Sequence, residues 1–162
     1  MPKEITVDPL NKKSVADAIK ELKRYKAWVI EKEALLRNRL AMIGATVASI
    51  QFSRAIYNGA KDVSVRVDNT GSVAVIYAEG KDVAFIEFGA GAKYGYGHPE
   101  AAKFGTGPGT YPDGKGHWDN PKGWWYGNSQ HSFGNPPAMA MYEARERMVE
   151  QVTQIAREAF RS

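Results

Sequence analysis

The stretch Val83-Ala-Phe-Ile-Glu-Phe-Gly89 lies where the chain changes character. Before it, the sequence has the periodicities of helices and strands. After it, residues 89–136 hold 12 of the 16 glycines. The stretch is short and apolar, with successive side chains alternating between two faces, which predicts a buried strand. On such a strand Glu87 faces away from Phe88, toward solvent or a neighbouring chain.

Two further strands are predicted just before this stretch. Residues 63–67 alternate valine with Ser64 and Arg66, the pattern of a half-buried strand. Asn69-Thr70-Gly71 has the composition of a hairpin turn, with glycine suited to a positive φ. Residues 73–78 then pair back, and the stretch at Val83 follows after a second turn. Residues 61–88 therefore predict a small antiparallel sheet of three to four strands.

Residues 14–58 show helical periodicity, after an extended arm at residues 1–13 that contains two prolines. Ser14 is the expected N-cap, and Asn58-Gly59 the expected end of the helical region. One continuous helix and two jointed helices both fit, because neither Gly nor Pro separates the two apolar sets. Gly44 lowers helix propensity by about 1 kcal/mol, which predicts close packing or a bend there.

A closing helix is predicted over residues 137–160, because Pro137 suits a first helical turn. Its expected buried stripe is Met141, Met148, Val152, Ile155 and Ala159. The predicted fold is therefore α+β in one domain, residues 1–162. Long N-terminal helices pack on a small antiparallel sheet, and the long loop at residues 89–136 leads into the C-terminal helix.

Composition excludes several classes of protein. The chain of 162 residues is 43% hydrophobic and 25% charged, values typical of a globular domain. It has no cysteine, no run of about 20 apolar residues and no signal-peptide pattern at its N-terminus, so we expect no membrane association and a cytoplasmic site of synthesis. The net charge of +4 is mild for a nucleic-acid-binding domain, although an acidic partner stays open.

The loop at residues 89–136 also holds 9 of the 18 aromatic residues. Loops of this length in compact domains are usually functional or disordered, and disordered segments are poor in aromatics. The small predicted core cannot cover so many rings, so we expect them to contact other subunits. The predicted interface consists of Tyr94, Tyr96, Phe104, Tyr111, Trp118, Trp124, Trp125, Tyr126 and Phe133.

The sequence also leaves room for two functions other than contact between subunits. His98, Asn120 and His131 superficially resemble a His-Asn-His metal nuclease, but they lie far apart within glycine-rich sequence. Residues 124–126 suit a stacking platform for glycans or nucleic acid, but few basic residues accompany them. The sequence therefore predicts no enzyme, and no catalytic, cofactor-binding or metal site.

The order of the short motifs resembles that of the tail-completion (neck) proteins of long-tailed bacteriophages. The resemblance rests on two segments. They are residues 85–91 (Phe-Ile-Glu-Phe-Gly-Ala-Gly) at the end of a predicted strand and residues 135–139 (Asn-Pro-Pro-Ala-Met) at the start of a predicted helix. Longer-looped relatives are also similar at residues 98–100 and 123–126. Many relatives have Pro-x-Asp-Thr-Gly where this chain has residues 57–62, so the subgroup stays open.

The resemblance implies a structural virion protein at the head–tail junction. It implies a ring, often of six copies, that terminates the tail tube or joins the tail to the head. The partners would be the tail tube protein and adjacent neck or head-completion proteins, with transient contact to DNA passing through the ring. The protein would be located in the virion, after assembly in the host cytoplasm. The resemblance implies no catalysis and no cofactor. Five residues match the family as a framework: Glu87, Phe88, Gly89, Pro136 and Pro137.

Overall fold

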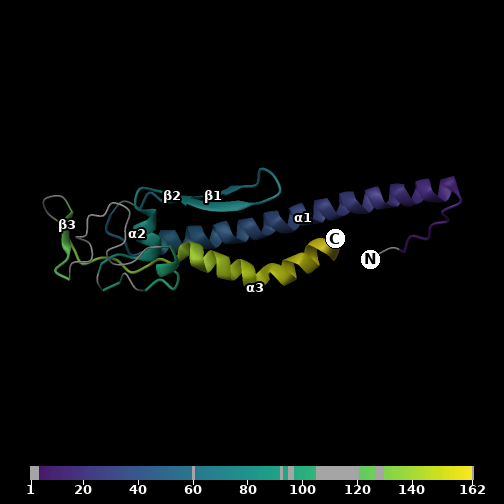
Figure 1. The fold of residues 1–162 in the computed structure, drawn as a ribbon. Helices are drawn as coiled ribbons and strands as arrows, with labels where there is room; N and C mark the ends of the chain where they lie inside the picture. The colour runs from purple at the N-terminus through teal and green to yellow at the C-terminus, as the bar shows by residue number, and fades with distance from the viewer. Residues whose placement is uncertain are drawn as a thin grey trace.

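The computed structural model describes residues 4–59, 61–91, 93–94, 97–104, 121–126 and 130–161. The elements in chain order are α1 (Lys12–Arg54), β1 (Ser64–Asp68), β2 (Val75–Glu79), α2 (Val83–Phe88), the 3-10 helix η1 (Ala102–Phe104), β3 (Trp124–Tyr126), β4 (Gln130–Ser132) and α3 (Ala140–Arg161). The predicted α+β class is confirmed. The molecule is elongated, with α3 and the β1–β2 hairpin lying along the C-terminal part of α1 (Figure 1).

α1 is one continuous helix, and it begins before the predicted start. Its N-cap is Asn11, whose side-chain oxygen accepts the backbone N–H groups of Lys13 (3.0 Å) and Ser14 (3.3 Å). Ser14, the expected N-cap, lies inside the helix instead. Its hydroxyl oxygen accepts the backbone N–H of Asp8 at 2.9 Å, which holds the arm against the helix.

α1 ends at Arg54, before the predicted Asn58-Gly59 stop. Ala55 is the C-cap, in an extended conformation, and Ala55 and Tyr57 are both buried. They pack with Phe52 and Ile86 in the central cluster. The chain therefore leaves the helix at the point where Ala55 and Tyr57 enter the core. The glycine at position 59 does not set the end of the helix.

α3 packs antiparallel along α1. A Cβ at Gly44 of α1 would lie 2.7 Å from Met148 Sδ of α3 and 2.5 Å from Ile76 Cδ1 of β2, so the predicted close packing at this glycine is confirmed. Further along, Trp28 contacts Phe160 edge-on. The predicted stripe of α3 is wrong at Val152, which is exposed. The fully buried positions of α3 are Ala140, Ala144, Ile155 and Ala159.

β1 and β2 form the predicted antiparallel hairpin, with Asp68 opposite Val75. Side chains alternate between half-buried and exposed along both strands, as the sequence predicted. Gly71 in the connection has φ 106°, which confirms its positive-φ assignment. Asp68 accepts hydrogen bonds from the backbone N–H (2.8 Å) and the hydroxyl (2.6 Å) of Thr70, which orders the turn.

The predicted third strand is wrong, because Val83–Phe88 is the short helix α2. A six-residue apolar run satisfies both periodicities, so its neighbours decide the conformation. The C-terminal carbonyls of α2, which have no partner within the helix, accept hydrogen bonds from the segment before α3. The donors are Asn135 Nδ2 to the Phe85 carbonyl (2.8 Å), Ala138 N to the Ile86 carbonyl (2.8 Å) and Met139 N to the Glu87 carbonyl (3.2 Å).

The region predicted as one irregular loop contains regular structure. β3 and β4 form a second antiparallel hairpin, in which Trp125 lies opposite His131. An isolated bridge joins Ala90 to Asn135, so this hairpin is anchored to the segment that follows α2. The closing helix also begins at Ala140 and not at Pro137, since residues 135–139 serve as hydrogen-bonding partners of α2.

The core lies where the C-terminal end of α1, α2 and the N-terminal end of α3 meet. Its buried members are Ala48, Phe52, Ala55, Tyr57, Ile86, Ala140 and Ala144. Among the described residues, Ile86 is the largest side chain with almost no exposed surface. α2 therefore occupies the centre of the fold. None of the helices in the described ranges is long and apolar enough to cross a membrane.

Candidate functional site

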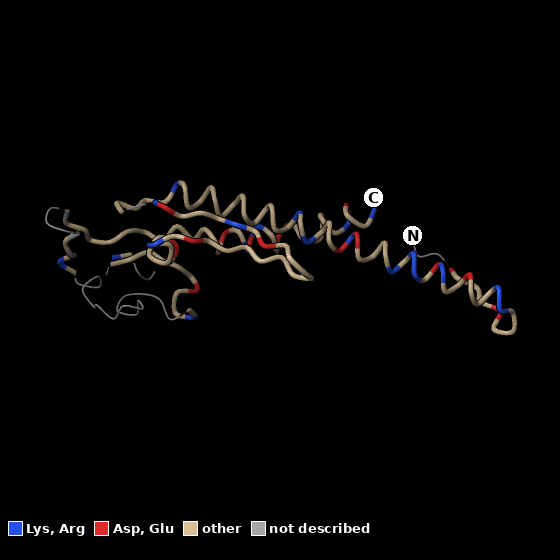
Figure 2. The backbone as a smooth tube through the Cα atoms, turned by 90° about the horizontal axis from the view of Figure 1, so that it is seen from above, with Lys and Arg blue, Asp and Glu red and all other residues tan. Residues whose placement is uncertain are grey.

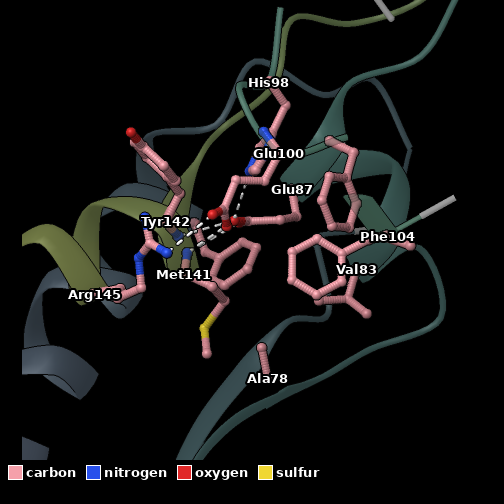
Figure 3. Close-up of a pocket in the computed structure, with 12 residues that line it drawn as sticks. Ala78, Val83, Glu87, His98, Glu100, Phe104, Met141, Tyr142 and Arg145 are labelled. Atoms are coloured by element: carbon pink, nitrogen blue, oxygen red, sulfur yellow. Dashed lines mark hydrogen bonds and ion pairs between the residues drawn. The ribbon is translucent and has the colours of Figure 1, made fainter. Parts of the chain in front are cut away.

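Glu87 of α2 is a buried carboxylate at the first turn of α3, only 6% exposed (Figure 3). Its Oε1 accepts the backbone N–H of Met141 (3.0 Å) and of Tyr142 (3.1 Å), and its Oε2 lies 3.1 Å from Met141 N. Backbone N–H groups of a first helical turn have no partner within the helix, and the helix dipole favours negative charge there. The expectation that Glu87 faces solvent or a neighbouring chain is therefore wrong.

His98 completes this buried network, at 5% exposure. Its Nδ1 accepts the backbone N–H of Glu100 at 3.1 Å, and its Nε2 lies 3.4 Å from Glu87 Oε1. With Nδ1 occupied as an acceptor, a neutral imidazole carries its proton on Nε2 and donates it toward Glu87. The ring also packs against Phe88 and Tyr142. His98 thus links the segment at residues 97–104 to α2 and α3.

The structure brings together the framework residues that the phage resemblance indicated. Gly89 has φ 77° and ψ 168°, a conformation essentially restricted to glycine. A Cβ there would lie 2.8 Å from Pro137 N and 2.9 Å from its Cδ. Phe88 contacts His98, and Pro136 accepts a hydrogen bond from Asn135 Nδ2 at 3.3 Å. These residues form the joint between α2 and α3, which is a structural role.

A largely apolar pocket of about 350 Å³ adjoins this network. The twelve residues that line it are Phe52, Ala78, Val83, Ala84, Glu87, Phe88, His98, Glu100, Phe104, Met141, Tyr142 and Arg145. Arg145 contacts Glu100 Oε1 at 2.9 Å and Glu146 Oε1 at 2.7 Å. The hydrogen bond to Glu146, with a smaller contribution from Glu100, raises the pKa of the Arg145 guanidinium, which stays charged.

The polar side chains of the pocket hold other parts of the protein in place. Both Glu87 oxygens already accept backbone N–H groups, and both imidazole nitrogens of His98 are engaged. These contacts give both side chains a structural role at the start of α3. Within the described residues, no group of three or more His, Cys, Asp or Glu side chains is placed to hold a metal ion. The geometry suits a pocket that receives an apolar side chain.

The second candidate surface is the β3–β4 hairpin at one end of the molecule (Figure 1). Trp125 is 65% exposed and Phe133 is 60% exposed. His131 lies between them, with ring centroids 4.7 Å from Trp125 and 4.5 Å from Phe133, both in edge-on geometry. We call these three residues the aromatic triad. Packed aromatic rings that leave this much apolar surface exposed are typical of a protein or ligand contact.

The residues of the predicted aromatic interface differ in how exposed they are, and some lie outside the described residues. Trp125, Phe133 and Phe104 are exposed, whereas Tyr94 is half-buried beside Lys93. Tyr96, Tyr111 and Trp118 lie outside the described residues, and for Trp124 and Tyr126 only the backbone strand is described. Of the three nuclease candidates, Asn120 also lies outside the described residues, while His98 and His131 belong to the two separate clusters above.

Sequence reasoning missed the roles of His98 and Asn135. The sequence did contain a signal for a buried partner such as His98, because Glu87 lies within an apolar run. A carboxylate in such a run requires buried partners such as a histidine or helix N–H groups. Asn135 precedes two prolines, which have no backbone N–H to donate. Its side-chain amide supplies a donor at this place and binds the Phe85 carbonyl of α2. Arg145 and Tyr142 carried no comparable signal.

No model of a known protein family, no curated protein and no solved structure matches this chain.

Proposed function

We propose that this chain is a structural subunit of a bacteriophage neck, which assembles with copies of itself into a ring at the head–tail junction. The observation that carries the proposal is the aromatic triad, which leaves Trp125 and Phe133 exposed at one end of the body. Apolar rings of this kind are enriched where protein subunits meet, and each orders few rotatable bonds on contact.

The apolar pocket supplies a second surface of the same chemistry. Phe104 at its edge is exposed, and the pocket is lined mainly by carbon atoms of Phe, Val, Ala and Met side chains. A ring needs two different surfaces on each subunit, because head-to-tail contacts join one patch to another. The exposed triad and the pocket are two such patches. We include in the proposal that the triad of one copy contacts the pocket of the next, because both surfaces are apolar.

The phage assignment within this proposal draws on the resemblance at residues 85–91 and 135–139. These two segments pack on each other through Gly89 and Pro137, so the matching residues belong to one structural unit. A unit of this kind is a joint that positions the β3–β4 hairpin relative to α3. Such a joint suits a subunit whose contacts must repeat identically around a ring.

The proposal is tested by genetics in a phage that encodes this chain. An amber mutation in its gene should leave heads and tails unjoined, or tails of abnormal length, in electron micrographs of the lysate. The wild-type chain supplied in trans should restore particles, whereas a Trp125→Ser/Phe133→Ser chain should not. A double variant at two exposed residues outside both surfaces, Val73→Ser/Lys81→Ser, is the matched control. Normal particles from the amber mutant would contradict the proposal.

A further inference from the structure

The N-terminal part of α1 extends beyond the rest of the molecule. α3 ends at Arg161, and Phe160 near its end packs against Trp28 of α1. From there back to Lys12, no other helix of the described residues lies beside α1 (Figure 1). At 1.5 Å per residue this free part of the helix spans roughly 24 Å. Residues 4–11 fold back along one side of it, and together with the helix they line a hollow of about 450 Å³.

This free part of α1 accounts for the net charge of the whole chain. Residues 12–27 contain six Lys or Arg and two Asp or Glu, a net charge of +4, and the entire sequence also has a net charge of +4. The other residues therefore sum to zero. Figure 2 shows Lys and Arg along this end of the molecule. A net charge concentrated on one exposed helix segment favours an acidic partner.

The same segment exposes an apolar stripe. Ile19, Leu22 and Tyr25 are 48%, 56% and 54% exposed. Because they are three residues apart, they follow one another along one side of the helix. Lys23 and Lys26 lie one turn after Ile19 and Leu22, and so form a basic edge to the stripe. We call these five residues the α1 surface.

The opposite edge of the stripe has mixed charge, because Glu21 forms an ion pair with Arg24 at 2.8 Å. Glu21 lies one turn before Tyr25, and Asp17 lies one turn before Glu21. Both line the hollow beside the arm, together with Glu4. A DNA duplex offers no apolar surface that could cover the stripe, and a broad anionic bilayer would also meet Glu4 of the arm beside the helix. A second copy of the same surface would bring one net charge of +4 against another.

We propose that the α1 surface binds an acidic amphipathic helix of another protein. The apolar side of that helix would cover Ile19, Leu22 and Tyr25, and its carboxylates would pair with Lys23 and Lys26. Helices dock in this way when anchors three and four residues apart meet an apolar partner. The α1 surface lies at the end of the molecule opposite the aromatic hairpin (Figure 1), so its partner can bind without displacing a contact at the triad.

A synthetic peptide tests this surface on the full chain. The probe is a fluorescein-labelled 21-residue peptide with leucines at helical spacing and glutamates elsewhere, and a scrambled peptide of the same composition is its control. Fluorescence anisotropy should show saturable binding of the amphipathic peptide, about tenfold or more tighter than of the scrambled one. Added salt should weaken this binding, because exposed charge pairs are screened.

Variants separate the two components of the surface. Leu22→Asp and Lys23→Glu/Lys26→Glu should each weaken binding about tenfold or more. Val73→Asp and Lys61→Glu/Lys81→Glu make the same changes at exposed positions elsewhere, and should bind like the wild type. Far-UV circular dichroism checks that each variant is folded.

Four results would overturn the inference. The first is equal affinity of the chain for the two peptides, and the second is unchanged binding of the amphipathic peptide by Leu22→Asp. The third is tighter binding of a 20-bp DNA duplex or of phosphatidylserine vesicles than of the amphipathic peptide. The fourth is a Leu22→Asp chain that loses self-association. The last would assign the surface to a second copy. A phage whose neck assembles without this chain would refute the proposed function and leave these binding results unaffected.

Discussion

The carboxylate of Glu87 accepts the backbone N–H of Met141 at 3.0 Å, although 54 positions separate the two residues in the chain. This contact joins the central helix α2 to the start of α3. Together with the bonds from Tyr142 and His98 it satisfies a charge that is otherwise withdrawn from water. A buried carboxylate of this kind contributes to stability mainly because its N–H partners would be orphaned without it.

Glu87→Gln should lower the free energy of unfolding by about 1.5–3 kcal/mol, the range for hydrogen bonds to a charged group. The amide retains the size of the side chain but loses the charge and one acceptor. Chemical denaturation monitored by circular dichroism measures the change. Glu150→Gln, at an exposed position of α3 with one surface ion pair, should change stability by less than about 0.5 kcal/mol. Equal effects of the two substitutions would rule out a stabilising role for the bonds from Glu87 to the first turn of α3.

Gly89→Ala should destabilise the protein by about 1–3 kcal/mol more than Gly71→Ala. Both glycines have positive φ, so both substitutions strain the backbone. Only at Gly89 would the new Cβ also meet Pro137, while nothing lies within 4 Å of a Cβ at Gly71. The difference between their denaturation midpoints reports the glycine-restricted backbone of Gly89 together with the packing of α2 on the segment before α3. A difference near zero would show that this joint is loose.

Thr70→Ala should raise the pKa of Asp68. The Thr70 hydroxyl, and secondly its backbone N–H, hold this pKa below the ordinary value of an aspartate. The Asp68–Thr70 interaction stabilises the fold at pH values above the ordinary pKa, and its contribution is lost as pH falls through the lowered one. Carboxyl ¹³C NMR titration measures the pKa in each chain. An identical Asp68 titration in the variant would exclude the hydroxyl as its cause.

Local patterns in the sequence were sufficient to predict the long helices and the β1–β2 hairpin. Residues 63–67 alternate over a full strand, and the apolar residues of α1 repeat over many turns, so periodicity determines the element type. Gly44 and Gly71 were also interpreted correctly, because close helix packing and a positive φ are both constraints that glycine satisfies.

The assignments that failed depend on contacts distant in sequence. Whether residues 83–88 form strand or helix depends on donors at residues 135–139, which no local pattern reveals. The wrong assignment placed Glu87 in solvent, and so hid its network with His98 and α3. The aromatic composition of the loop did indicate an exposed surface at Trp125 and Phe133. It did not indicate that a hairpin presents them, or that His131 lies between them.

The central claim is that copies of this chain meet through the aromatic triad. Native mass spectrometry and light scattering across a concentration series test it most directly, with the wild-type chain beside Trp125→Ser/Phe133→Ser. We expect a closed oligomer of defined copy number for the wild type and a monomer for the variant, with thermal melting of the monomer changed by only a few degrees. A wild-type chain that stays monomeric at high concentration, or a variant that forms the same oligomer, would contradict the claim.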